Sequence, residues 1–194
     1  MKPVQPIPLA SAGGLAIVPV AAGHAAMLAA LVLRDKEHLE AYLPMVATLS
    51  TVAATTAHLE RAAVRAAEGE VFEWHLFETD SLCGSVRVKD IDHDDRKASI
   101  GYFLGSQCTG KGIITSALRA VLAWCFDTLG LNRIELRCAT GNAPSIRVAE
   151  RLGFVREGLL RQDECLHGVF VDHYVFGLLN SEFRRGTKDG GSRT

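Results

Sequence analysis

Residues 105–112, with the sequence Gly-Ser-Gln-Cys-Thr-Gly-Lys-Gly, form a glycine-rich segment that begins like a P-loop. Gly105, four further residues, Gly110 and Lys111 match that pattern. A P-loop then continues with Ser or Thr, whose hydroxyl group holds the magnesium ion of a nucleoside triphosphate. Gly112 stands at that position instead. Because the position after Lys111 has no hydroxyl for a metal ion, the segment favours a diphosphate group that is bound without magnesium.

A helix is expected directly after this segment, because apolar residues recur at three- and four-residue spacing over 113–129. The start of a helix offers unpaired N–H groups and the positive end of the helix dipole, and both attract anions. Gly110 and Gly112 let the backbone approach a ligand closely, since no Cβ atom intervenes. Further donors are available from the side chains of Gln107, Thr109 and Lys111. The segment therefore predicts an anion site, although a plain turn into a helix would carry the same residues.

The elements that position this loop are predicted from the period of the apolar residues. Strands are expected over 15–19, 71–78, 81–90, 97–105, 133–138, 154–166 and 169–178. Helices are expected over 22–42, with a break near Asp35, and over 51–68, 113–129 and 143–152. The three strands before the loop are joined by short turns, which indicates an antiparallel meander. P-loop folds are instead wound from βαβ units around a largely parallel sheet. The order of elements thus argues against an ATP site, as does the absence of a later apolar strand ending in Asp.

The composition is that of an ordinary globular protein, with 194 residues, 48% hydrophobic residues and a formal net charge of −1. We expect one domain over 15–184, between a flexible arm at 1–14 and a flexible tail at 185–194. The charge balance shows no sign of nucleic acid as a partner. The apolar stretch 15–33 is interrupted by Pro19, Gly23 and His24, so we interpret it as a strand followed by a buried helix rather than a membrane segment or signal peptide.

The five cysteines are odd in number and widely spaced, with no Cys-x-x-Cys pair. This pattern fits neither a disulfide framework nor a structural zinc site, and it predicts reduced thiols in a cytoplasmic protein. Cys108 lies in the glycine-rich loop near a helix N-terminus, where a thiol pKa can be lowered. A covalent mechanism would also need a paired histidine, and no histidine lies nearby in the sequence.

Two segments resemble the GCN5-related N-acetyltransferases (the GNAT family). Residues 107–112 are similar to the Gln/Arg-x-x-Gly-x-Gly/Ala loop that binds the pyrophosphate of coenzyme A in that family. Residues 142–161, "NAPSIRVAERLGFVREGLLR", are similar to the Asn-x-x-Ser … Ala-x-x-x-Gly-Phe-x-x-Glu-Gly run of the RimJ/RimL subgroup, which acetylates protein N-termini. The resemblance covers roughly 15–180 in matching element order.

The resemblance implies an α/β (α+β) GNAT fold: a mixed, mostly antiparallel sheet of about seven strands, splayed between its fourth and fifth strands and flanked by helices. Acetyl-CoA would lie in the split. The residues implied in cofactor binding are the main-chain groups of Phe103 and Leu104, the loop residues Gln107, Cys108, Thr109, Gly110, Lys111 and Gly112 with Ile113 after them, and Asn142 and Ser145 at the next helix. A metal ion is not expected.

Acyl transfer from a thioester to an amine needs a base for the amine, donors for the oxyanion and a proton for the departing thiolate. By the resemblance, Glu164 is the candidate base, and alternation along the strand would turn Asp163 to the opposite face. Many family members supply the proton from a tyrosine, but Ala149 stands at that position here. Ser145 is then the implied donor to the thiolate, although it also fits a cap near the start of a helix. His167 and His173 are candidates for contacts with the acceptor.

The sequence therefore predicts an acetyltransferase that moves an acetyl group from acetyl-CoA to a primary amine. By the resemblance, the favoured acceptor is the N-terminal α-amine of a protein of the ribosomal type, and the subgroup suggests a homodimer. Two alternatives stay open. The acceptor could be a small amine such as a polyamine or an antibiotic. The loss of the tyrosine at Ala149 also permits a non-catalytic module that only binds coenzyme A.

Overall fold

The structure is a computed structural model, and it describes residues 4–10 and 14–190, with side chains up to Arg185. Contacts between residues divide the chain into two compact units. The first unit holds the residues up to Lys89 together with Gly101–Val121. The second unit holds Asp90–Ile100 and the residues from Leu122 onward.

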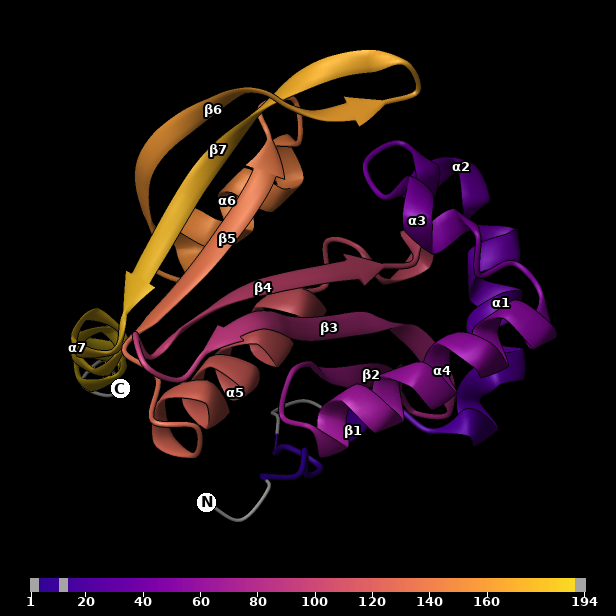
Figure 1. Cartoon of the computed structure of the whole chain (residues 1–194), viewed down its shortest axis with the longest axis horizontal. Coiled ribbons are helices and arrows are strands. Elements are labelled where there is room, and N and C mark those ends of the chain that lie inside the picture. The colour runs from indigo at the N-terminus through magenta and orange to yellow at the C-terminus, as the bar shows by residue number, and fades with distance from the viewer. Residues whose placement is uncertain (1–3, 11–13, 191–194) are drawn as a thin grey trace. The chain divides into compact units, whose positions relative to one another are not determined.

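Within the described residues, seven strands form one mixed sheet in the order β1-β2-β3-β4-β5-β7-β6 (Figure 1). Their bounds are β1 Leu15–Pro19, β2 Phe72–Glu78, β3 Ser81–Asp92, β4 Lys97–Leu104, β5 Arg133–Ala139, β6 Val155–Leu166 and β7 Val169–Leu179. All seven strands that the sequence predicts are present, and the expected fold class is confirmed.

The pairing along the sheet is antiparallel except at one place. β1 pairs with β2 from Leu15 opposite Glu78 to Pro19 opposite Trp74. β4 and β5 are parallel, and the ladder between them joins 97–99 to 133–135, the first three residues of each strand. β5 and β6 both pair with β7 in the antiparallel sense. The mixed sheet with one short parallel ladder is what the resemblance implies for the centre of the sheet.

The first predicted helix is divided into shorter pieces. η1 (Ala22–His24) and α1 (Ala25–Arg34) are followed by α2 (Lys36–Glu40), with Asp35 between the two α-helices. The predicted break near Asp35 is confirmed. A short α3 (Pro44–Ala47) follows that the sequence did not indicate, and α4 (Val52–Ala67) matches the prediction closely. Thr51 caps α4 by accepting a hydrogen bond from the backbone N–H of Ala54, at 3.2 Å.

Both faces of β2 are buried in the first unit. Phe72, Trp74 and Leu76 lie on one face and are at most 1% exposed, as their alternation predicts. The opposite face carries Glu73 and His75, which are also buried. α4 packs on this second face, with His58 lying 3.4 Å from the Glu73 carboxylate. The helix cover explains why polar residues of this strand lie inside the protein.

The second unit is built on β5, β6 and β7. Its core includes Ile134 of β5 together with Phe176 and Leu178 of β7, all at most 1% exposed. α6 (Ala143–Arg151) contacts β5, and α7 (Asn180–Gly190) follows β7 directly. β6 and β7 form a long twisted hairpin (Figure 1). The remaining helix, α5 (Ile113–Asp127), follows the glycine-rich loop as predicted.

Parts of the two predicted terminal segments lie within the described residues and make contacts there. Leu9 forms an isolated antiparallel bridge with Ile17 of β1, and the indole N–H of Trp74 donates to the carbonyl of Ile7 at 2.9 Å. α7 extends to Gly190, past the predicted start of a flexible tail at 185. Residues 1–3, 11–13 and 191–194 of these predicted segments lie outside the described residues. Among the described helices, none combines the length and the apolar character that a membrane crossing requires.

Candidate active site

The glycine-rich loop leaves β4 and enters α5 through one short turn, η2 (Ser106–Cys108). The backbone N–H of Gly105 donates to the carbonyl of Cys83 on β3 at 2.8 Å, so the loop starts against that strand. Within the loop, the N–H of Cys108 donates to the carbonyl of Gly105 at 3.0 Å. The Thr109 hydroxyl donates to the carbonyl of Ser106 at 2.8 Å. These bonds fix the first half of the loop before the glycines are reached.

Asp35 anchors the loop from the end of α1. Its carboxylate is only 6% exposed and accepts from the Ser106 N–H at 3.1 Å and the Ser106 hydroxyl at 2.8 Å. The guanidinium of Arg34 donates to the same carboxylate at 2.9 Å. The hydrogen bond from Arg34, with those from Ser106, holds the pKa of Asp35 below its usual range. The sequence predicts Asp35 only as the place of a helix break, and it does not predict this anchoring role.

The second half of the loop is exposed and has the backbone shape of an anion cradle. Gly110 and Gly112 have φ angles of +76° and +77°, which favour glycine, and a Cβ atom at either position would meet nothing within 4 Å. At the start of α5, the Ser116 N–H donates to the Gly112 carbonyl at 3.0 Å. The N–H groups of the first turn of α5 therefore lack partners within the helix. An exposed backbone of this kind at a helix N-terminus can accept an anion.

The side chains of the loop divide into exposed donors and one buried thiol. Gln107, Thr109 and Lys111 are exposed, and the Lys111 ammonium lies 3.0 Å from the Glu78 carboxylate at the end of β2. The Cys108 thiol is buried instead, and it donates to the sulfur of Cys83 at 2.8 Å. Burial, together with that hydrogen bond, raises the pKa of Cys108 to about 12. The thiol is thus protonated at neutral pH, which argues against the nucleophile considered from the sequence.

The backbone carbonyl groups of Phe103 and Leu104 point in different directions. A Cβ atom added to Gly84 of β3 would come within 2.1 Å of the Phe103 carbonyl oxygen, so that oxygen lies against β3. Successive residues of a strand direct their backbone groups to opposite edges. The carbonyl of Leu104 is therefore the one directed away from β3, and it is the better candidate for pairing with an extended ligand. The sequence could not separate the two residues.

Asn142 and Ser145 belong to the second unit, at the start of α6. The side-chain carbonyl of Asn142 accepts from the backbone N–H of Ser145 at 3.2 Å, so Asn142 is the N-cap of the helix. The Ser145 hydroxyl interacts with the Cys138 thiol of β5. Burial raises the pKa of Cys138, and the hydrogen bond with Ser145 opposes this rise. The motif thus has a clear structural role here, and it fixes the position of the Ser145 side chain.

Glu164 and Asp163 both contact the same histidine of β7. The Glu164 carboxylate lies 3.3 Å from Nε2 of His173, and the Asp163 carboxylate lies 3.5 Å from Nδ1 of that ring. The expectation that Asp163 faces the opposite side was wrong. The reason is an irregularity in β6, where residues 161–163 stand opposite the single residue Asp172.

The irregularity is stabilised by Asp172 itself. Gln162 has a φ angle of +53°, and its backbone N–H donates to the Asp172 carboxylate at 2.8 Å. Such bulges re-aim neighbouring side chains and break the alternation of a strand. The side chain of Glu164 is 42% exposed, whereas that of His173 is only 10% exposed. A partly exposed carboxylate supported by a buried imidazole can accept a proton from an approaching amine.

The predicted site residues thus fall into two groups. The loop residues and the backbone of Phe103 and Leu104 lie together in the first unit. Asn142 and Ser145 lie at the start of α6 in the second unit, and Glu164 lies on β6 of the same unit. Asp35 and Glu78 were missed by the sequence reasoning, because their roles depend on contacts with residues 71 and 33 positions away in the chain.

A mixed, open seven-stranded sheet with a glycine-rich loop between its fourth strand and the next helix defines an α/β fold. Residues 15–155 match the acetyltransferase (GNAT) domain, and the chain belongs to that family.

Relatives and solved structures support the RimJ/RimL subgroup of this family. The N-acetyltransferase p20 of Bacillus licheniformis, described as uncharacterized, is 40% identical over 106 residues, which cover 55% of this chain and 60% of the relative. The ribosomal-protein-serine acetyltransferase of Escherichia coli (strain K12) is 35% identical over 97 residues, which cover 50% and 54%. The chain therefore spans less than two thirds of the length of these relatives. Mycobacterium smegmatis RimJ, solved in complex with CoA-disulfide, has 28% identity and a TM-score of 0.86, covering 97% of this chain and 95% of that structure.

Proposed function

We propose that the chain transfers an acetyl group from acetyl-CoA to the N-terminal α-amine of a protein. The observation that carries the proposal is the exposed, glycine-rich backbone over 109–112 at the start of α5, which fits a diphosphate. Membership of the acetyltransferase (GNAT) family supports a coenzyme A thioester as the ligand. The similarity to a ribosomal-protein-serine acetyltransferase supports a protein acceptor.

The loop would bind the diphosphate mainly through backbone N–H groups. Lys111 adds a cation beside them, and Glu78 already holds its ammonium group in place. Gln107 and Thr109 offer exposed polar side chains on the same loop. Leu104 would pair with the extended pantetheine arm through its backbone. Each of these contacts positions the thioester without taking part in the chemistry.

Glu164 is proposed as the base that takes a proton from the acceptor amine. An α-amine has a pKa near ~8 and is partly neutral at pH 7, so a carboxylate is sufficient to remove its proton. The contact with His173 orients the Glu164 carboxylate, and its partial exposure leaves it within reach of an amine. The neutral amine then attacks the thioester carbonyl, and the carbon–sulfur bond breaks when the tetrahedral intermediate collapses.

Ser145 is proposed as a hydrogen-bond donor to the departing thiolate. A serine hydroxyl is a poor acid, so its role is to stabilise charge on the sulfur, and water completes the proton transfer. Ala149 of α6 stands where many family members carry a tyrosine, and its methyl side chain has no proton to give. That the chain acts as one domain over 15–184 and as a cytoplasmic homodimer stays a prediction.

An acceptor screen with acetyl-CoA and mass-spectrometric detection tests the proposal. The panel holds peptides with free N-termini, the same peptides with blocked N-termini and internal lysines, and small polyamines. We expect acetylation of the free N-termini alone. Turnover confined to polyamines would replace the protein acceptor by a small amine. Binding of acetyl-CoA with no turnover across the panel would favour a non-catalytic coenzyme A module.

A further inference from the structure

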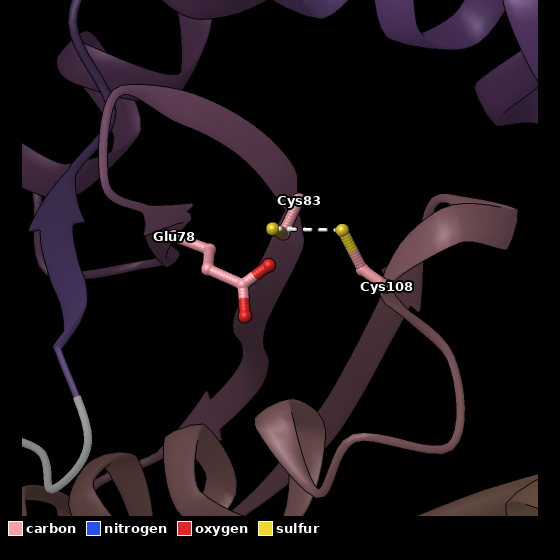
Figure 2. Close-up of side chains that lie close together, drawn as sticks. All are labelled: Glu78, Cys83 and Cys108. Atoms are coloured by element: carbon pink, nitrogen blue, oxygen red, sulfur yellow. Dashed lines mark hydrogen bonds between the residues drawn. The ribbon is translucent and has the colours of Figure 1, made fainter.

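A cluster of metal-binding side chains lies at the base of the glycine-rich loop. One ligand atom each from Glu78, Cys83 and Cys108 lies within 4.8 Å of the other two. Figure 2 shows the two sulfur atoms facing each other, with one carboxylate oxygen of Glu78 on their side. The three residues come from the end of β2, the start of β3 and η2, and all belong to the first unit. The proposed acetyl transfer uses Glu78 only to hold the Lys111 ammonium, and it uses neither cysteine side chain.

We propose that Glu78, Cys83 and Cys108 form a site for a thiophilic divalent cation such as Zn²⁺. Two sulfurs and one carboxylate oxygen are a ligand set that zinc accepts, with a fourth position left for water. Zinc–sulfur bonds of about 2.3 Å in a tetrahedron place two sulfurs about 3.8 Å apart. The sulfurs stand 2.8 Å apart here, so they would separate by about 1 Å when the ion enters.

The charges of the site favour a divalent ion over a monovalent one. Two thiolates and the Glu78 carboxylate would offer three negative charges to an ion, and the Lys111 ammonium, 3.0 Å from that carboxylate, offsets one of them. When the ion binds, the two thiols become thiolates and release two protons to the buffer. The two positive charges of the ion then balance the two thiolates, whereas a monovalent ion would leave one thiolate uncompensated. The ion therefore needs no additional counter-charge in this partly buried place.

An ion can reach the cluster from the side of Glu78. The side chain of Glu78 is 45% exposed, whereas Cys83 is fully buried and Cys108 is 8% exposed. The exposed carboxylate therefore gives an ion a path into the site, and the two buried sulfurs are the soft ligands that hold it. The bound ion would link Cys108 of η2 to Cys83 of β3, and this link would hold the start of the loop against the strand. The sequence does not predict that Cys83 and Cys108 lie together. The two cysteines are separated by 24 residues, whereas the cysteines of common zinc motifs are only a few residues apart.

Metal titration of the full chain tests the site without any coenzyme. The protein is stripped with a chelator, kept reduced with a phosphine, and titrated with Co²⁺. Sulfur-to-cobalt charge-transfer absorption reports thiolate ligation, and the visible bands report tetrahedral geometry. Competition with Zn²⁺ then gives the affinity for zinc. We expect one saturable step at one ion per chain, followed by displacement of Co²⁺ by Zn²⁺.

Variants assign the ligands. C83S and C108S should each lose the charge-transfer band and weaken binding by more than about a hundredfold, since even residues behind the ligands contribute ten- to a hundredfold. E78Q should keep the band and bind about tenfold more weakly. C165S alters an exposed cysteine on β6 and should leave binding unchanged.

Circular dichroism and thermal unfolding confirm that each variant is folded, and C108S serves where C83S does not fold. The proposal is overturned if the reduced chain binds no Co²⁺, or if C108S and E78Q bind as the unaltered chain does. Because no acetyl-CoA is present, failure of this site leaves the proposed acetyl transfer untouched.

Discussion

The loop over 105–112 and the hairpin of β6 and β7 place their polar groups in opposite ways. The loop is fixed by buried contacts, with the carboxylate of Asp35 and the carbonyl of Cys83 holding its first residues. The Glu164 carboxylate instead lies near the end of β6, close to the hairpin turn. Its direction depends on the irregular stretch of that strand. The proposed diphosphate loop therefore has a buried, hydrogen-bonded start, whereas the proposed base Glu164 keeps partial access to water.

Removal of the carboxylate charge at Glu164 should have the largest effect. E164Q keeps the shape of the side chain but cannot accept the proton of the amine, so we expect kcat to fall about a thousandfold. The KM for acetyl-CoA should stay unchanged. D163N is the matched control, because Asp163 contacts the same ring of His173, and it should retain most of the activity. Equal losses in both variants would point to His173 as the group that matters.

Acid should destabilise the first unit through His75. The ring is fully buried beside His24, and burial lowers the pKa of His75 to about 4. The unfolded chain takes up a proton near pH 6.5, whereas the folded chain does so only near pH 4. Stability is therefore complete above pH 6.5 and falls as the pH drops toward 4, by up to about 3 kcal/mol.

Urea unfolding at a series of pH values measures this loss. H75Q removes the titrating ring, so its stability should depend less on pH between about 6.5 and 5, above the range where carboxylates begin to titrate. An unchanged slope in H75Q would mean that another group binds the proton. This experiment measures stability, whereas the E164Q experiment measures activity. The region around His75 and the β6–β7 hairpin are therefore tested independently.

Loss of the buried anchor at Asp35 should destabilise the fold by about 3 kcal/mol. D35A leaves the N–H and the hydroxyl of Ser106 without their acceptor and also removes the partner of Arg34. S106A keeps the carboxylate and loses one hydrogen bond, so its cost should be about 1 kcal/mol. Free energies of unfolding in urea measure both. A cost for D35A no larger than that for S106A would show that the anchor contributes little.

A charge at Gly112 should weaken binding of coenzyme A by about a hundredfold. G112D places a carboxylate beside the diphosphate and forces a side chain into a φ angle of +77°. G168D is the matched control, because Gly168 has a φ angle of +81° in the β6–β7 turn with nothing within 4 Å of an added Cβ. Calorimetry with coenzyme A should show unchanged affinity for G168D. Undiminished affinity in G112D would remove the loop as the diphosphate site.

The sequence predicted most of the fold, because the elements with a clear apolar period were placed within a few residues. β1 matches its prediction, and α4 and β7 differ by one residue at most at each end. α3 was missed because four residues are too few to show a helical period. Residues 185–194 were predicted as a tail because their composition is polar, and 185–190 of them form the end of α7.

The candidate site was predictable only where a local motif exists. The loop and the cap at Asn142 each depend on residues close together in the chain, so their spacing could be recognised. Asp35 contacts a residue 71 positions away, and the Cys83–Cys108 pair spans 25 positions. The common direction of Asp163 and Glu164 arises from an irregular strand, which simple alternation cannot anticipate. Contacts of this kind require the tertiary structure.

The ion pair between Lys111 and Glu78 has a consequence for how quickly a ligand is captured. The only cation of the loop is already neutralised at 3.0 Å, and the whole chain carries a formal charge of −1. An incoming polyanion therefore meets little long-range attraction, and its association rate should vary only weakly with ionic strength. Selectivity for the ligand then depends on its dissociation rate, which is set by short-range contacts with the backbone.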